Sequence, residues 1–334
     1  MPLALTATSR SVPKEHINSV TTGIVLKIAA TLAFAVMSAL IKAISARFPV
    51  AEIVLFRSLG ALVVLVIWLS SAGEFPRALA TRRPFGHIGR SLAGSGGMSA
   101  NFLVLALLPL ADATAFTFIS PLLIVPLAAL ALGEIVKPYR WAAVTVGFFG
   151  VLVMLSDHLG GGSPAGAAKL GVTIALVGAL CTAVAMIQTS RLAHSEATGA
   201  IVFYFTSVTT ILSAALIAAA AFWPAGARLA WLAATQAYVA PNPEELVTLA
   251  LIGALGGLGQ ILMTHSYRFA DASIIAAFDY VSMVWAAILG LVFFAEAPTL
   301  RILAGALIVC AAGLFVLWRE RRVKRIAVEA ATHL

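Results

Sequence analysis

The sequence predicts an all-α integral membrane protein with ten transmembrane helices, arranged as two inverted five-helix repeats. Three observations support this fold class. The chain is 61% hydrophobic and only 11% charged, with a mean hydropathy of +1.01. Apolar runs of about 18 residues or more, which is long enough to span a bilayer, recur along its length. The motif Ala-Asp-Ala-Thr at 111–114 returns as Ala-Asp-Ala-Ser at 270–273.

Each apolar run is expected to be a helix, because backbone groups inside lipid must satisfy their own hydrogen bonds. The predicted spans are, in order, 20–42, 50–71, 87–108, 111–132, 139–156, 170–190, 199–222, 244–267, 272–294 and 299–318. The chain is thereby divided into a polar tail (1–19), a first repeat (20–156), a linker (157–169), a second repeat (170–318) and a basic tail (319–334). Residues 1–19 show no features of a signal peptide, so the first span is expected to be an uncleaved anchor.

The repeated motif aligns the two halves of the chain. When Asp112 is placed on Asp271, a pattern of two glycines and an amide coincides as well. The matched residues are Gly94, Gly97 and Asn101 in the first half, and Gly253, Gly256 and Gln260 in the second. Because five spans is an odd number, the second repeat starts on the opposite side of the membrane. Inverted repeats are typical of secondary transporters, whose substrate site lies near the midplane.

Charge placement predicts the topology. The formal net charge is +8, yet basic residues cluster at span ends rather than in a nucleic-acid-binding patch. With both termini in the cytoplasm, fifteen Lys and Arg residues, Arg90 among them, lie at or near the inner side and five lie outside. This positive-inside bias favours a multi-pass protein of the cell inner membrane. Cys181 and Cys310 fall within spans and are expected to be buried thiols.

Several residues are candidates for helix caps. Asp112 and Asp271 precede predicted spans, where an Asp side chain accepts hydrogen bonds from free N–H groups and favours the positive end of the helix dipole. A gating or ion-binding role for them stays open. Asn242, followed by Pro243, is a similar helix start.

The chain resembles the EamA type of the drug/metabolite transporter superfamily. The resemblance covers about residues 20–318 and rests on "EIVLFR", "PLADATAFTFISPLLIVPLAALALGE" and "RWAAVTVGFFGVLV" in the first half, and on "YRFADASIIAAFDYVSMVWAAILGLVFFAE" in the second. It implies a central cavity lined by the third, fourth, eighth and ninth spans, with the first, second, sixth and seventh moving around it. Within the family the pattern looks closest to S-adenosylmethionine or riboflavin uptake carriers. Ala277 stands where the family often has proline.

Ionisable groups inside a membrane cost about 2.5–3.5 kcal/mol each, so they are functional candidates. Arg57 is expected to point into the bundle and to hold an anionic group or a structural partner. Asp279 is expected to carry a proton, face a substrate amine or pair with a cation. Glu52 lies near the outer end of its span, and His265 could titrate near neutral pH. Lys27 can extend to the cytoplasmic headgroups or serve in transport.

Uncharged candidates complete the predicted site. Asn101 and Gln260 are equivalent amides that either hold helices together or line the cavity. Each of the other candidates has helix packing as its alternative role. They are Tyr280, Gln188, Tyr204, Phe116, Ser120, Pro121 and Trp285.

The sequence therefore favours a secondary transporter that moves a small organic metabolite, such as an amino acid, nucleoside-like or vitamin-like compound, by alternating access. Proton coupling is possible, lipids are its surroundings, and no cofactor, metal or nucleic acid is expected. A monomer and a homodimer both remain open. The competing classes are a membrane enzyme, for which no catalytic motif is present, and a membrane sensor.

Overall fold

The computed structural model describes residues 14–120, 122–124, 127, 138–159, 167–193, 195–222, 238–266, 269, 278 and 281–332. Within these residues the secondary structure is helical, with ten α-helices and one 3-10 turn. The first half contributes α1 (Lys14–Ile44), α2 (Val50–Ser71), η1 (Arg77–Leu79), α3 (Pro84–Leu107), α4 (Leu110–Thr117) and α6 (Pro138–Leu159). The second half contributes α7 (Ala167–Ala193), α8 (Thr198–Phe222), α10 (Pro243–Ser266), α12 (Val281–Phe294) and α13 (Leu300–Thr332).

Helix boundaries follow the apolar runs closely. The predicted span 50–71 coincides with α2, and the ends of most other predicted spans lie within a few residues of the observed helix ends. The largest difference is at the C-terminus, where α13 continues to Thr332. Most of the predicted basic tail 319–334 is thus an extension of the last helix. Parts of the predicted spans 111–132 and 272–294 lie outside the described residues.

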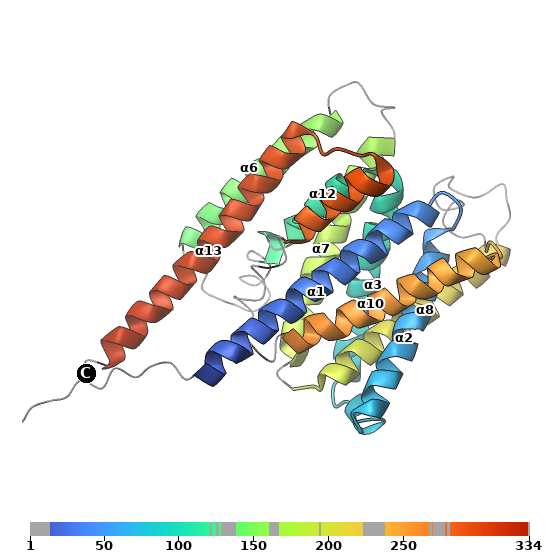
Figure 1. Cartoon of the computed structure of the whole chain (residues 1–334), viewed down its shortest axis with the longest axis horizontal. Coiled ribbons are helices and arrows are strands. Elements are labelled where there is room, and N and C mark those ends of the chain that lie inside the picture. The colour runs from blue at the N-terminus through green and yellow to red at the C-terminus, as the bar shows by residue number, and fades with distance from the viewer. Residues whose placement is uncertain are drawn as a thin grey trace, which may run out of the picture.

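The packing of the helices has the symmetry expected of inverted repeats. If α1, α2, α3, α4 and α6 correspond in order to α7, α8, α10, α12 and α13, the principal contacts occur in matched pairs. α1 packs on α10 as α7 packs on α3, and α2 packs on α10 as α8 packs on α3. The helix pairs α2 and α8, α4 and α12, and α6 and α13 each join equivalent elements. Figure 1 shows α6 and α13 side by side at one flank of the bundle. The two halves therefore pack mainly against each other, and their interface is the centre of the molecule.

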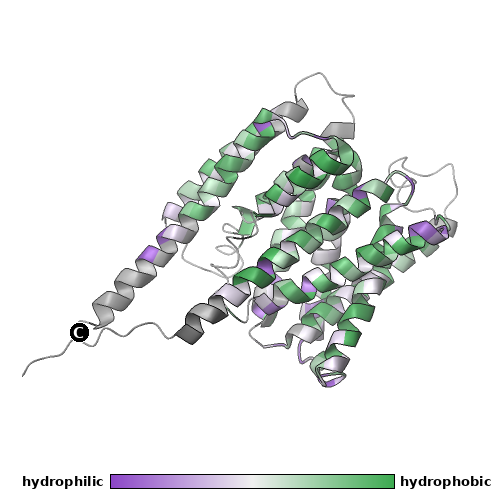
Figure 2. Ribbon diagram, in the orientation of Figure 1, coloured by the Kyte–Doolittle hydropathy of each residue, from purple (hydrophilic) through white to green (hydrophobic). Residues whose placement is uncertain are grey.

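Apolar side chains cover the outside of the helices. Five helices of the described residues are long and apolar enough to cross a membrane, and four shorter apolar helices accompany them. Large apolar side chains remain exposed on several helices. Examples are Val63 (59%) and Ile67 (63%) on α2, Phe149 (61%) on α6 and Leu307 (71%) on α13. Figure 2 shows the helices coloured mainly as hydrophobic, with hydrophilic residues on the described C-terminal part of α13. Lipid tails, rather than water, suit such a surface.

Glycines let helices of the two repeats approach closely. A Cβ on Gly60 of α2 would lie 2.7 Å from the Gly253 Cα of α10. A Cβ on Gly150 of α6 would lie 2.8 Å from the Gly305 carbonyl oxygen of α13. Backbone contact of this kind is the usual means of close helix packing in membranes. Gly150 and Gly305 therefore pack together within one chain, although the sequence alone equally allowed them to pack between two chains.

The two predicted helix caps in the described residues have different outcomes. The α4 helix begins at Leu110 after Pro109, so Asp112 lies within the first turn and is not its N-cap. The prediction of an Asp112 cap is wrong because the helix already begins at Leu110, with Pro109 in the N-cap position. At the start of α10, Asn242 Oδ1 accepts from the Glu245 N–H at 2.9 Å, and Glu245 Oε2 accepts from the Asn242 N–H at 2.8 Å. This reciprocal capping box confirms the Asn242 cap.

Candidate functional site

A cavity of about 310 Å³ lies between the two repeats. Its volume falls at the lower end of the range of about 300–1,000 Å³ that is typical of small-molecule sites. Its described lining comes from seven helices, namely α1, α2, α3, α4, α7, α8 and α10. The family resemblance implied a lining from the third, fourth, eighth and ninth spans only. The first, second, sixth and seventh spans also contribute side chains, because the repeats cross each other at this point.

Arg57 contributes a buried positive charge to the cavity wall. Arg57 lies two turns into α2, and its side chain is only 4% exposed and lines the cavity. Gly256 on α10 makes room for it, since a Cβ there would lie 2.8 Å from Arg57 Nε. Among the described residues, Nε has no hydrogen-bond partner. The guanidinium thus has a free donor in a largely apolar interior.

Arg90 is a second buried cation in the same cavity, in the first turns of α3, the end of the helix that the sequence predicts to lie toward the cytoplasmic side. It is 9% exposed and lines the cavity from α3. Its Nε donates to Thr189 Oγ1 at 3.0 Å, and its guanidinium lies 4.1 Å from the Phe205 ring centroid. Nη1 has no hydrogen-bond partner among the described residues.

The signal that could have identified Arg90 is helical spacing. Arg90, Gly94 and Asn101 are separated by four and then seven residues, which places them on one face of α3. All three line the cavity. The pattern of glycines and an amide on α3 reaches Arg90 when it is extended by one turn toward the N-terminus.

The equivalent amides meet at the cavity. Asn101 of α3 and Gln260 of α10 both line it, so the symmetry of the repeats brings them to one chamber. Four methionines and three phenylalanines supply most of the apolar wall, and they are Met37, Met98, Met186, Met263, Phe34, Phe102 and Phe205. Among the described residues, no Asp or Glu lines the cavity, and no cluster of three or more His, Cys, Asp or Glu could hold a metal ion.

Four other predicted site residues lie away from this cavity. Phe116 and Ser120 are buried in the bundle, with 1% and 6% exposure, and are not in the cavity wall. Trp285 is half-buried on α12, and His265 on α10 forms edge-on ring contacts with Trp68 and Phe269. Their surroundings agree with a packing role.

Of three more predicted residues, Gln188 and Tyr204 pack against the first turns of α3, and Lys27 is buried in α1. Gln188 packs over Gly89, where a Cβ would lie 3.2 Å from its Oε1. Tyr204 stacks on His87, with the ring centroids 4.8 Å apart. Lys27 is 1% exposed, so it does not extend to the headgroups as the sequence suggested. Asp271, Asp279, Tyr280 and Pro121 lie outside the described residues.

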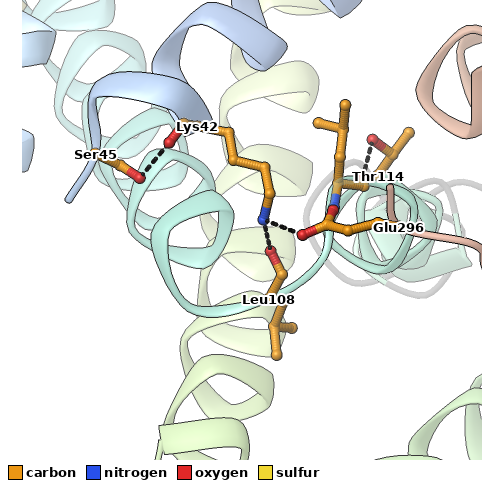
Figure 3. Close-up of polar contacts among 6 residues, drawn as sticks. Lys42, Ser45, Leu108, Thr114 and Glu296 are labelled. Atoms are coloured by element: carbon orange, nitrogen blue, oxygen red, sulfur yellow. Dashed lines mark hydrogen bonds and ion pairs between the residues drawn. The ribbon is translucent and has the colours of Figure 1, made fainter. Parts of the chain in front are cut away.

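Polar contacts join the repeats at the end of the bundle where α1 and α3 finish. Figure 3 shows Lys42 Nζ directed at the Leu108 carbonyl oxygen, 2.8 Å away, and at Glu296 Oε1, 3.1 Å away. Glu296 Oε2 also accepts from the Leu110 N–H at 2.9 Å. One carboxylate from the second repeat thus connects α1 to the start of α4. We call Lys42, Leu108, Leu110 and Glu296 the carboxylate tie.

Glu52 belongs to this same end of the bundle and not to the cavity. It lies in the first turn of α2, the end of the span that the sequence predicts to be outer, and its side chain is 0% exposed. Its Oε2 accepts from the Val239 N–H at 2.9 Å, which connects α2 to the segment before α10.

The opposite end of the bundle holds a second contact between the repeats. His87 Nε2 lies 3.5 Å from Glu196 Oε2, and the two side chains are 1% and 2% exposed. The Arg82 N–H also donates to Glu196 Oε1 at 3.1 Å. Burial raises the pKa of the Glu196 carboxyl, but the hydrogen bond from the Arg82 N–H and the nearby Thr81 and His87 side chains outweigh burial and lower that pKa below its ordinary value of 4.5.

Comparisons with known proteins agree with this geometry. The EamA-like transporter family matches residues 21–156 and 169–318. The S-adenosylmethionine uptake transporter of Rickettsia prowazekii is 27% identical over 81% of this chain and 84% of its own length. The pseudopaline exporter CntI of Pseudomonas aeruginosa is 28% identical, covering 87% and 94%. The riboflavin transporter of Rhizobium johnstonii is 28% identical, covering 74% and 75%. One crystal structure, with 21% identity, covers 93% of this chain and 99% of its own at a TM-score of 0.59, which shows the fold.

Proposed function

The chain belongs to the EamA-like transporter family, and we propose that its central cavity is the substrate site of a secondary carrier for a small organic metabolite. The observation that carries this proposal is a cavity built jointly by both repeats and lined by the buried side chain of Arg57. In inverted-repeat carriers the substrate site lies at the interface of the repeats, and one repeat moves against the other around it. Arg57, Asn101 and Gln260 are the substrate-contacting residues in this proposal.

Alternating access requires that contacts at each end of the bundle break in turn. The carboxylate tie closes one end, and the His87–Glu196 contact holds the other. Both are polar contacts between the first and second halves of the chain. Such contacts can exchange protein partners for water as an end opens, which an apolar seal cannot do.

The proposed orientation follows from charge. With Arg90 counted within the membrane, fourteen of the fifteen inner cations remain, against five outside. We therefore place both termini in the cytoplasm and the carrier in the inner membrane. The division into repeats at 20–156 and 170–318, with a linker between, is part of the same proposal. Coupling to a proton would require a titrating group, for which Asp279 and Glu52 are the candidates.

The relatives named above handle chemically different metabolites, and one is an exporter while two are described as transporters of vitamin or cofactor compounds. The proposal for this chain therefore stays at the level of a small organic metabolite. S-adenosylmethionine and riboflavin are the specific alternatives to test first.

Counterflow in proteoliposomes tests the proposal. Purified protein is reconstituted, loaded with one metabolite from a panel of amino acids, nucleosides, vitamins and S-adenosylmethionine, and supplied with the labelled compound outside. The wild-type chain should accumulate label for at least one compound, and Arg57→Ala should abolish that accumulation. Arg83→Ala is the matched control, because Arg83 is exposed just before α3 and its described hydrogen bond to Thr81 uses the backbone N–H, which alanine keeps. Wild-type counterflow by Arg57→Ala would reject the assignment.

A further inference from the structure

Among the residues that the structure describes, the central cavity carries two buried cations and no carboxylate. Arg57 on α2 and Arg90 on α3 are both buried, with only 4% and 9% of their surfaces exposed. They interact electrostatically as like charges. Each has a guanidinium nitrogen without a hydrogen-bond partner among the described residues, Nε in Arg57 and Nη1 in Arg90. Buried charges in proteins are ordinarily paired, so this arrangement requires an explanation.

Neutralisation of the arginines by proton loss is not an available solution, because the guanidinium stays protonated in proteins. Arg90 is partly compensated by Thr189 and by the face of Phe205. Arg57 has no such contact among the described residues. Among those residues, no carboxylate lies in the cavity wall. Within the described part of the chamber the two arginines thus have no carboxylate partner, and a bound ligand can supply one.

We propose that the substrate is a small organic acid whose carboxylate binds between Arg57 and Arg90, which rests on the proposed role of this cavity in transport. The planar guanidinium group offers a fork of donors that matches the two oxygens of a carboxylate. One carboxylate between two arginines relieves their mutual repulsion and satisfies the two free donors together. The amides Asn101 and Gln260 line the same chamber and can orient the polar remainder of the ligand.

The rest of the wall indicates what else the ligand contains. Thioethers and aromatic rings form most of the remaining surface, with Met37, Met98, Met186 and Met263 from four different helices. Methionine side chains are flexible and polarisable, so they adapt to apolar groups of different shape. The chamber thus suits an acid with one apolar arm rather than a fully hydrated inorganic anion.

Matched acids and amides test this proposal on the full chain in detergent. Phenylpropionate is compared with phenylpropionamide, hexanoate with hexanamide, and methionine with methioninamide, and thermal stabilisation and calorimetric affinity are both measured. At least one acid should bind wild-type protein about tenfold or more tightly than its amide, because charge-assisted hydrogen bonds to a carboxylate are stronger than neutral ones to an amide. Arg57→Gln and Arg90→Gln should each remove that preference, and Arg83→Gln, an exposed cation at the start of the same helix as Arg90, should keep it.

Three results would overturn the proposal: equal binding of acids and amides, no binding of any acid, or an acid preference that survives both glutamine variants. Should a glutamine variant fail to fold, Arg57→Lys and Arg90→Lys keep the charge without the fork and should bind the acid more weakly than wild type. Failure of the transport proposal has a different outcome. Counterflow with equal binding of acid and amide would leave the carrier assignment intact, whereas acid-selective binding without counterflow would remove it.

Discussion

The crossing of α2 and α10 leaves no room for a methyl group, and this makes Gly253→Ala a sharp test of the repeat interface. A Cβ on Gly253 would lie 2.8 Å from the Gly60 Cα and 3.1 Å from the Phe56 carbonyl oxygen. Both of these atoms belong to the backbone, so no side-chain rotation relieves the overlap. Because carbon atoms pack best at about 3.5–4.0 Å, the two helices must separate by about 1 Å.

The magnitude follows from two opposing terms. Overpacking of a well-packed interior typically costs about 1–3 kcal/mol. The replacement of glycine by alanine in a helix contributes up to about 1 kcal/mol in the opposite direction. Gly96→Ala on α3 is the matched control, since a Cβ there would meet Cys181 Sγ at 3.6 Å, an ordinary contact. The propensity term is shared, so Gly253→Ala should be less stable than Gly96→Ala by about 1–3 kcal/mol.

Denaturant-induced unfolding of the detergent-solubilised protein measures this difference. Both variants and the wild type are followed by circular dichroism, and the free energies of unfolding are compared. The result expected is a clear loss for Gly253→Ala and little change or a gain for Gly96→Ala. Equal stability of the two variants would show that α2 and α10 do not pack backbone to backbone, and the repeat interface described here would be wrong.

Two further predictions concern the ends of the bundle. Glu296→Ala removes the ion pair to Lys42 and the acceptor of the Leu110 N–H. Because the paired side chains are only 14% and 27% exposed, we expect the free energy of unfolding to fall by about 1–2 kcal/mol. The control Glu74→Ala, at an exposed position, should lower it by about 0.5 kcal/mol or less. No loss would show that the tie does not hold this end closed. The pKa of Glu196 in the folded state is lowered below its ordinary value of 4.5. The carboxylate therefore stabilises the fold at pH values above 4.5, and this stabilisation disappears as the pH falls through the folded-state pKa. Wild type should therefore be more stable than Glu196→Gln at neutral pH and should lose this advantage below about pH 4.5. Melting temperatures of both proteins, measured across this pH range, test the expectation. A stability advantage that grows on acidification would contradict the contacts at Glu196.

The sequence was sufficient for the helices and their duplication. Lipid forces each spanning segment to close its own backbone hydrogen bonds, so hydropathy alone locates helices such as α2, which matches residues 50–71. The repeated motif and glycine spacing also imply inversion, because an odd number of spans reverses the second copy. Those inferences depend on local composition and counting, which are properties of the chain itself.

Only the tertiary structure decided which polar groups face one another. From the sequence Arg90 is only one of many cations near a span end, but it lines the cavity, and Asp112, predicted as a cap, lies inside its helix. Glu296, between α12 and α13, accepts from the N–H of Leu110, 186 residues away in the chain, and its ion-pair partner Lys42 comes from α1. A side chain's charge is written in the sequence, but its partner depends on how helices from both repeats rotate and cross, and the contacts that fix those rotations are made between distant residues.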